Sequence, residues 1–392
     1  MSSSMLMERF REGQRLARQR KLPEAEQAFR DCLAMREKDI PARNQLAMVL
    51  ARMGRLGEAE AELLRVLAQD GGSLPALSQL GALYERQGMP EKALPLYRKC
   101  LERKPQDVPA ALQLSKLLAR RGETAEAEAV LVKVAGSLAD ISQVPAICAL
   151  GALYAQQGRL DEARRQFKAC LKLDAGNIHA RHQLGMVYVK AGRFEKAEAL
   201  FKECLELDPA QYQAYHQLGM LYAKQGRYQE AEAALRACVR LDPGQPAAYQ
   251  HLGALYMKTG RADEAGRMFA KCLDLRPTPE SLGQMAIYHA QLGRASQAWG
   301  LLTRMPQGPV RTKATHMCAT ALSKAGDPAA SLAFLQDILA SEPNNPAALH
   351  LMGVLYARAG DVQNAEACFQ RVLTADPGNE PAQRTLAKLL AV

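Results

Sequence analysis

Residues 212–245 read YQAYHQLGMLYAKQGRYQEAEAALRACVRLDPGQ, and variants of this stretch fill most of the chain. Gly226 separates a first helical segment from a second one. Equivalent glycines recur at intervals of 33 to 36 residues, at Gly54, Gly88, Gly122, Gly158, Gly192, Gly226, Gly260, Gly293, Gly326 and Gly360. A period of this length predicts a solenoid of helix pairs, in which each pair packs against the next one.

The register of the glycines defines eleven repeats, and Arg20 takes the place of the turn glycine in the first. Positions are counted from the first residue of each repeat. The predicted repeats begin at Leu6, Ile40, Leu74, Val108, Val144, Ile178, Tyr212, Pro246, Pro279, Thr312 and Pro346. Glu380–Val392 remains and is expected to form one last helix. The sequence therefore predicts 23 helices and no sheet.

Small residues occupy two positions of every repeat. Position eight is glycine in seven repeats, alanine in three and Ser115 in one. Position twenty is alanine in ten repeats and Ser331 in the other. We expect the two helices of a repeat to approach closely at these positions. Position twenty-four is Phe, Tyr or Leu throughout, and we expect it to fill the space between neighbouring helix pairs.

This pattern resembles the tetratricopeptide repeat, and the resemblance covers essentially the whole chain. Residues 212–245 match the family pattern almost throughout. The main departure is position twenty-seven, commonly alanine in the family and here cysteine in six repeats: Cys32, Cys100, Cys170, Cys204, Cys238 and Cys272. The resemblance implies an all-α fold, a right-handed superhelical α-solenoid, in which the first helices line a concave groove.

The regularity of the repeats suggests four segments. These are repeats one to four (1–143), the most regular repeats five to eight (144–278), repeats nine to eleven (279–379) and a capping helix (380–392). Repeat four is lengthened through residues 135–140, and repeats nine and ten are degenerate. Prolines within residues 305–309 are expected to shorten the second helix of repeat nine.

Nine cysteines are present, without any Cys-x-x-Cys spacing. Equivalent atoms of successive repeats should lie roughly 8–10 Å apart, whereas disulfide-bonded cysteines need Cα atoms within about 7 Å. We therefore expect reduced packing thiols and no metal site. Charged residues follow the N-terminus too closely for a signal peptide, and no stretch is apolar enough to span a membrane. These features predict a cytoplasmic protein without membrane insertion.

The inward-facing positions five, six and nine are where the family places ligand contacts. Glutamine occupies position six in six repeats, and methionine recurs at position nine. The sequence HQLGM occurs at both 182–186 and 216–220, which favours a site in repeats six to eight, although recent duplication explains it equally well. The candidate peptide-binding residues are His182, Gln183, Met186, Lys190, His216, Gln217, Met220, Lys224, His251 and Lys258.

The chain has a formal net charge of +10 at pH 7. Position thirteen is basic in nine repeats, at the last turn of the first helix, where cations complement the helix dipole. These residues also form a basic lip along the predicted groove, which favours a partner of acidic character. Nucleic acid is not the expected partner, because no aromatic stacking platform or base-reading module is present.

An enzyme is not expected, because the chain lacks phosphate-binding, zinc-protease and serine-hydrolase motifs. No catalytic residue, metal or cofactor is predicted. The sequence favours a non-enzymatic scaffold or adaptor that binds a peptide or protein segment in its groove. The alternatives are a self-assembling coat component, a nucleic-acid-associated helical repeat, and a fragment of a transferase that carries such an array.

Overall fold

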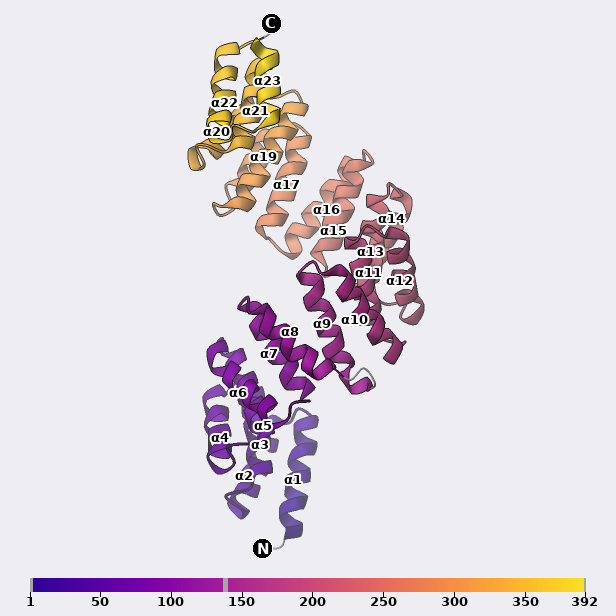
Figure 1. Cartoon of the computed structure of the whole chain (residues 1–392), viewed down its shortest axis with the longest axis vertical. Helices are drawn as coiled ribbons and strands as arrows, with labels where there is room; N and C mark the ends of the chain where they lie inside the picture. Colours follow the sequence, from indigo (N-terminus) through magenta and orange to yellow (C-terminus); the bar gives the residue numbers. More distant parts are fainter. Residues whose placement is uncertain (1–2, 137–139, 391–392) are drawn as a thin grey trace. The chain divides into compact units, whose positions relative to one another are not determined.

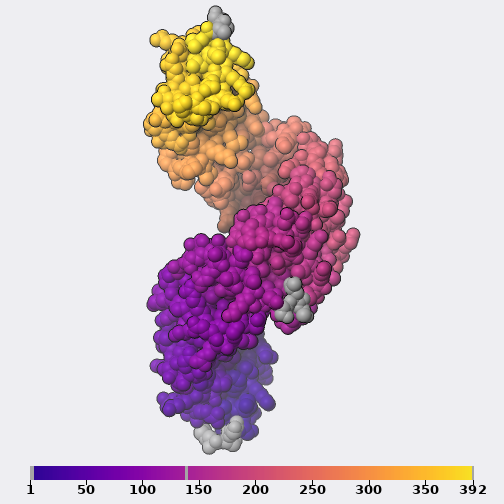
Figure 2. Space-filling model, viewed as in Figure 1, coloured from indigo at the N-terminus to yellow at the C-terminus, as the bar shows by residue number. Residues whose placement is uncertain are grey.

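The computed structural model describes residues 3–136 and 140–390. It divides into two units, Met1–Glu203 (unit 1) and Cys204–Val392 (unit 2). Figure 1 follows both from the indigo N-terminus to the yellow C-terminus, and in Figure 2 the repeats within each unit pack against one another without a break. Residues 137–139 of the predicted insertion in repeat four lie outside the described residues.

Unit 1 consists of antiparallel helix pairs. Its helices are α1 (Ser3–Arg18), α2 (Leu22–Met35), α3 (Ile40–Arg52), α4 (Leu56–Gln69), α5 (Leu74–Arg86), α6 (Pro90–Arg103), α7 (Val108–Arg120), α8 (Thr124–Ala135), the short 3-10 helix η1 (Ile141–Gln143), α9 (Val144–Gln156), α10 (Leu160–Leu173) and α11 (Ile178–Lys190). The next helix, α12 (Phe194–Leu207), contains the boundary between the units.

Unit 2 continues the same arrangement. Its helices are α13 (Tyr212–Lys224), α14 (Tyr228–Leu241), α15 (Pro246–Lys258), α16 (Ala262–Leu275), α17 (Pro279–Gln291), α18 (Ala295–Leu302), α19 (Pro309–Lys324), α20 (Pro328–Ser341), α21 (Pro346–Arg358), α22 (Val362–Ala375) and α23 (Glu380–Leu390). The described residues thus form the 23 predicted helices and contain no strand, which confirms an all-α solenoid of helix pairs.

Nine of the eleven first helices begin at the predicted residue. The exceptions are α1, which begins at Ser3 instead of Leu6, and α19, which begins at Pro309 instead of Thr312. Proline suits the first turn of a helix, because its φ is already helical and its missing N–H has no acceptor there. Pro309 therefore extends α19 upstream.

The turns inside the repeats explain the recurring glycine. All ten turn glycines have φ between 71° and 87°, a conformation that is strained for residues with a Cβ. Arg20 has the same conformation, with φ of 61°. It is a non-glycine residue held in the turn because the rest of its repeat fixes the chain there.

Position twenty-four packs on position eight of the same repeat, and not only between neighbouring pairs as predicted. A Cβ on any of the seven position-eight glycines would lie 2.6 to 3.0 Å from the position-twenty-four side chain. That side chain is aromatic in six of these repeats and Leu235 in the seventh. The four repeats with alanine or serine at position eight all have leucine at position twenty-four. The two positions are therefore matched in size.

Position twenty is the second close contact, as predicted. Its residue has no exposed surface in any of the eleven repeats. Where the alanine is replaced by Ser331, the hydroxyl donates to the carbonyl of Ala319, at position eight of the same repeat, over 2.8 Å. The buried hydroxyl thus keeps a partner although it replaces a methyl group.

An ionic cluster at the start of the second helix joins successive repeats. Arg159 lies 4.2 Å from the ring centre of Tyr154 and forms ion pairs with Glu162 and with Glu128 of the preceding repeat. The Tyr154 hydroxyl also donates to Glu128, over 3.0 Å. Glu162, in the first turn of α10, thus has a guanidinium partner in addition to the helix dipole.

The same cluster recurs in unit 2. Arg261 lies 4.3 Å from the ring centre of Tyr256, pairs with Glu264, and reaches Glu232 of the preceding repeat at 2.6 Å. Tyr256 again donates to Glu232, over 3.1 Å. We refer to each arginine, tyrosine and pair of glutamates as a repeat clamp.

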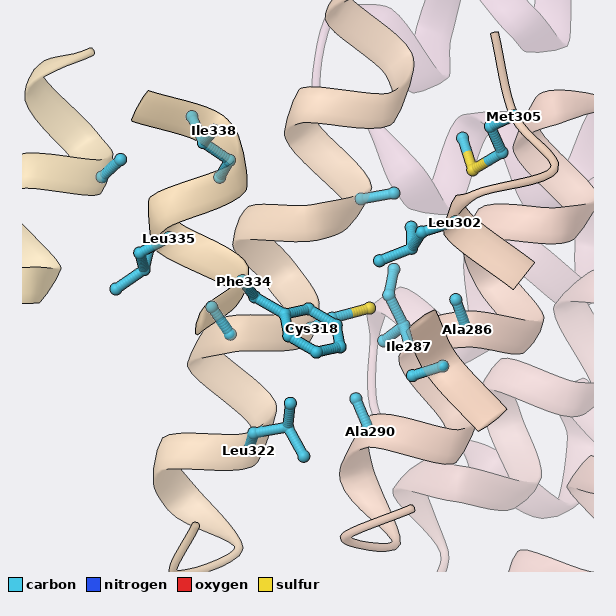
Figure 3. Close-up of a cluster of buried hydrophobic side chains, with 14 of the residues drawn as sticks. Ala286, Ile287, Ala290, Leu302, Met305, Cys318, Leu322, Phe334, Leu335 and Ile338 are labelled. Carbon is cyan, nitrogen blue, oxygen red and sulfur yellow. The ribbon is translucent and has the colours of Figure 1, made fainter. Parts of the chain in front are cut away.

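Repeat nine departs from the pattern as predicted. Its second helix, α18, has eight residues, whereas α16 and α20 have fourteen each. Met305, in the segment after α18, folds back into a buried cluster with Leu302 and Cys318 (Figure 3). An apolar side chain from the connecting segment thus takes the place of the missing helical turns.

Candidate functional site

The predicted groove residues lie on first helices in both units. In unit 1, α11 carries His182, Gln183, Met186 and Lys190. In unit 2, α13 and α15 carry the other six: His216, Gln217, Met220, Lys224, His251 and Lys258.

Position five is partly a packing position and not only an inward-facing one as predicted. The rings of His182 and Phe201 are 5.5 Å apart in repeat six, and those of His350 and Phe369 are 5.7 Å apart in repeat eleven. In each case the imidazole covers the position-twenty-four ring of its own repeat. These histidines therefore contribute to the wall of the first-helix surface as well as to its polarity.

The two groove histidines of unit 2 contact each other. The rings of His216 and His251, on α13 and α15, are 5.0 Å apart. Burial lowers the pKa of His251 below its ordinary value of 6.5. This part of the surface therefore gains charge at a lower pH than an exposed histidine would. Nearby, Met220 keeps 39% of its surface exposed and available for contact.

The basic lip has a structural role in addition to its charge. The Lys190 ammonium donates to the carbonyl of Ala155, at the C-terminus of α9, over 3.1 Å. Arg86 donates to the carbonyl of Ala51 in the same way, also over 3.1 Å. The position-thirteen cation thus caps the first helix of the preceding repeat, where the dipole is negative.

Two equivalent hollows lie on the first-helix surface of unit 1. The repeat-four hollow, about 490 Å³, lies between α7 and α9 and is lined by Gln113, Lys116, Leu131 and Ala152, among others. The repeat-two hollow, about 230 Å³, lies between α3 and α5. Its lining residues include Met48, Leu63, Gln79 and Ala82. Of these, Met48, Leu63 and Ala82 are equivalent to Lys116, Leu131 and Ala152 of the first hollow.

Two further hollows adjoin each other in unit 2. One, about 350 Å³, is lined by residues of α15, α17 and α19. The other, about 360 Å³, lies between α17 and α19. They share Ile287 and Met317, and together we call them the repeat-nine hollows. Met317 and Val310 are 42% and 43% exposed, so this surface presents apolar groups to an incoming ligand.

Hollows adjoin three of the four repeats that have alanine or serine at position eight and leucine at position twenty-four. These are repeats two, four and nine. Leu63 and Leu131 themselves line the first two hollows. An aromatic ring at position twenty-four is larger than leucine and occupies more of the space beneath the first helices. This signal was present in the sequence, but the groove prediction used only the inward-facing positions.

No group of three or more possible metal ligands occurs among the described residues. His179 and His182, three residues apart, differ in environment: His179 is exposed and His182 lies against Phe201. Over the same described ranges, none of the helices has the length and apolar character needed to cross a membrane.

Family models for the tetratricopeptide repeat match the chain in several segments. The matches cover residues 13–38, 40–106, 85–149, 146–210, 182–246, 222–287 and 322–390. One of the models alone matches three of these segments, 85–149, 222–287 and 322–390. Residues 288–321, between the last two matches, contain the short helix α18. No curated protein matches the chain.

Several solved structures are similar to parts of the chain. YrrB, described as having an unusual peptide-binding site, is 26% identical, with 46% of this chain and 92% of that one covered and a TM-score of 0.36. MamA is 25% identical, with 43% and 90% covered and a TM-score of 0.37. PilF of Pseudomonas aeruginosa is 18% identical, with 56% and 99% covered and a TM-score of 0.47.

Proposed function

Because the chain belongs to the tetratricopeptide repeat family, we propose that it is a non-enzymatic, cytoplasmic scaffold that binds an extended segment of another protein along its first helices. The observation that carries this proposal is the set of hollows on the first-helix surface at repeats two, four and nine. Each is large enough for an apolar side chain, and amides lie beside it for the peptide backbone.

The charges around the hollows support a partner of acidic character. Their lining contains one acidic residue, Glu280, and six basic residues: Arg52, Arg86, Lys116, Arg120, Lys313 and Lys324. Exposed charges of one sign attract an oppositely charged segment and are screened over about 8 Å at physiological ionic strength. Binding should therefore weaken as salt increases.

We propose that the predicted residues of repeats six to eight, which lie on first helices in each unit, also contact the partner. Gln183 and Gln217 are half-buried on α11 and α13, and each offers an amide to a backbone. The exposed Met220 adds an adaptable apolar contact. We assign these residues a supporting role, with the principal side-chain sites at the hollows.

Selection from a random peptide library displayed on phage tests this function. Selected peptides should combine acidic residues with large apolar ones, and their affinity should fall with salt. Ala152→Trp fills the repeat-four hollow, and Met317→Asp places a charge beside the repeat-nine hollows. Each substitution should weaken the binding of the peptides that occupy its own hollow at least about tenfold, the equivalent of 1.4 kcal/mol.

The matched control is Lys99→Gln, an exposed change on the second helix α6. It changes the charge by as much as Met317→Asp does, and Lys99 lines none of the hollows described above. Peptides that bind both hollow variants with wild-type affinity would disprove the proposed site. Oligomers seen by light scattering, with no peptide selected, would favour self-assembly instead.

A further inference from the structure

Two cysteine side chains of repeat five are in contact inside unit 1. Cys148 is at position five of α9, and Cys170 is at position twenty-seven of α10. Their sulfur atoms are 2.6 Å apart, so no other atom separates them. Both side chains are buried, with 9% of Cys148 and none of Cys170 exposed.

The pairing follows from the antiparallel packing of one helix pair. Position five of a first helix lies opposite the later turns of its second helix, as the contact between His182 and Phe201 also shows. Repeat five alone has cysteine at both position five and position twenty-seven. The 34-residue spacing relates cysteines at equivalent positions of successive repeats, whereas Cys148 and Cys170 occupy different positions of one repeat.

We propose that Cys148 and Cys170 form a redox modification site, which a small peroxide converts into a disulfide linking α9 to α10. Cys148 is the thiol that the peroxide reaches first, because Cys170 has no exposed surface. Cys170 then acts as the resolving thiol, at the distance that the helices already impose.

The environment of the two sulfur atoms fits these roles. The contact with Cys170 lowers the pKa of the Cys148 thiol, which favours the thiolate that reacts with peroxide. The same contact, together with burial, raises the pKa of Cys170. Cys170 also has a backbone contact, 3.6 Å from its sulfur to the carbonyl oxygen of Val144.

The reaction balances with peroxide as the only oxidant. The Cys148 sulfur attacks one peroxide oxygen, the O–O bond breaks, and a sulfenic acid and one water are formed. The Cys170 sulfur then attacks the Cys148 sulfur, so that the S–S bond forms and the S–O bond breaks. The departing hydroxide takes the proton of Cys170 and leaves as a second water. Two thiols have lost two electrons, and peroxide has gained them.

The site lies beside the proposed binding surface. Ala149 and Ala152, on the same helix as Cys148, line the repeat-four hollow. A disulfide would hold α9 against α10 and restrict any adjustment of α9 to a ligand in that hollow. The existence of the modification itself is independent of the proposed function.

The experiment treats the full-length protein with a modest excess of hydrogen peroxide, removes peroxide with catalase, and blocks free thiols with N-ethylmaleimide during unfolding in guanidinium chloride. Trypsin then releases residues 134–159 and 169–172, which contain Cys148 and Cys170 respectively and no methionine. The expected product is a disulfide-linked pair of these peptides, two hydrogens lighter than their sum. Dithiothreitol should restore both peptides to the thiol form.

Cys238 provides a matched control, because it has the same position in repeat seven, where position five is His216. It should be recovered as the maleimide adduct under the same conditions. Cys170→Ala should leave Cys148 as a sulfenic acid, trapped by dimedone, and Cys148→Ala should leave Cys170 unmodified. Recovery of both thiols as maleimide adducts from oxidised wild-type protein would overturn the proposal. So would sulfinic acid at Cys148 without any linked product.

Discussion

Phe269 rests directly on Gly253, its partner across the helix pair of repeat eight. A Cβ at residue 253 would lie 2.7 Å from Cε1 of this ring, closer than atoms can approach without displacement. Phe269 is 4% exposed, so its ring has little freedom to move aside. The glycine is therefore required by the size of the opposing ring.

Gly253→Ala should destabilise the protein by about 1–3 kcal/mol, because the added methyl overpacks the contact. Phe269→Leu alone should destabilise it by about 1 kcal/mol through lost packing. The double variant recreates the pairing of Ala47 with Leu63, so its loss should be about 1 kcal/mol smaller than the sum of the two. Urea unfolding followed by circular dichroism measures all three.

Gly300→Ala is the control for this cycle. Gly300 lies inside α18 with no atom within 4 Å of an added Cβ, so alanine should stabilise the helix by about 1 kcal/mol. Equal effects at positions 253 and 300 would show that the ring does not select for glycine.

The turn at Arg20 offers a stabilising substitution. Arg20→Gly should raise the stability by up to about 1 kcal/mol, because it removes the Cβ from a residue with φ of 61°. Gly54→Ala is the reverse change in the next repeat, where φ is 83°, and should lower it by about the same amount. Thermal unfolding detects both, and a loss of stability in Arg20→Gly would contradict the account of these turns.

The repeat clamps should make stability depend on pH. Hydrogen bonds from Arg159 lower the folded-state pKa values of Glu128 and Glu162 below the ordinary 4.5. A carboxyl with a depressed folded pKa stabilises the fold fully above its unfolded pKa, and this contribution disappears as the pH falls through the folded value. The melting temperature should therefore decline below about pH 4.5.

Glu128→Gln isolates this contribution. At pH 7 the variant should melt below wild type, and the difference should shrink on acidification and in high salt, because the pair is partly exposed. Glu102→Gln, an exposed change on α6, should melt like wild type throughout. A difference for Glu128→Gln that does not vary with pH would exclude an ionic origin.

The position-twenty-seven thiols should react slowly in the folded protein. Burial raises the pKa of both Cys100 and Cys238 to about 11, so little thiolate is present at pH 8. Iodoacetamide should modify them much more slowly before unfolding than after it, as mass spectrometry of the peptides will show. Rapid native labelling of both would mean that these thiols are exposed.

The sequence predicted the repeats well because their positions carry steric requirements. A turn glycine such as Gly226 is needed for its positive φ, and an alanine such as Ala231 is needed at a contact without any exposed surface. Each of these requirements acts on a single position, so it can be recognised in the sequence of one repeat. The first helices that differ from the prediction begin upstream of the predicted residue, as α19 does at Pro309.

The binding surface was less predictable because its shape depends on pairs of positions. Leu131 deepens a hollow that the inward-facing residues of repeat four do not indicate. The position of Lys190 in its repeat predicts a free charge on the basic lip. In the structure its ammonium donates to the carbonyl of Ala155, near the end of α9, and so caps that helix. The contact of Cys148 with Cys170 joins position five of one helix to position twenty-seven of the next. Comparing the same position across repeats does not reveal such a contact.

The partner segment is expected to lie on the first helices at the hollows. Photo-crosslinking with a selected peptide that carries benzophenone, followed by peptide mapping, shows where it lies. We predict crosslinks to the residues that line the hollows, on α7 and α9 or on α17 and α19. Crosslinks confined to second helices that line none of these hollows, such as α10, α16 and α20, would contradict this placement of the partner.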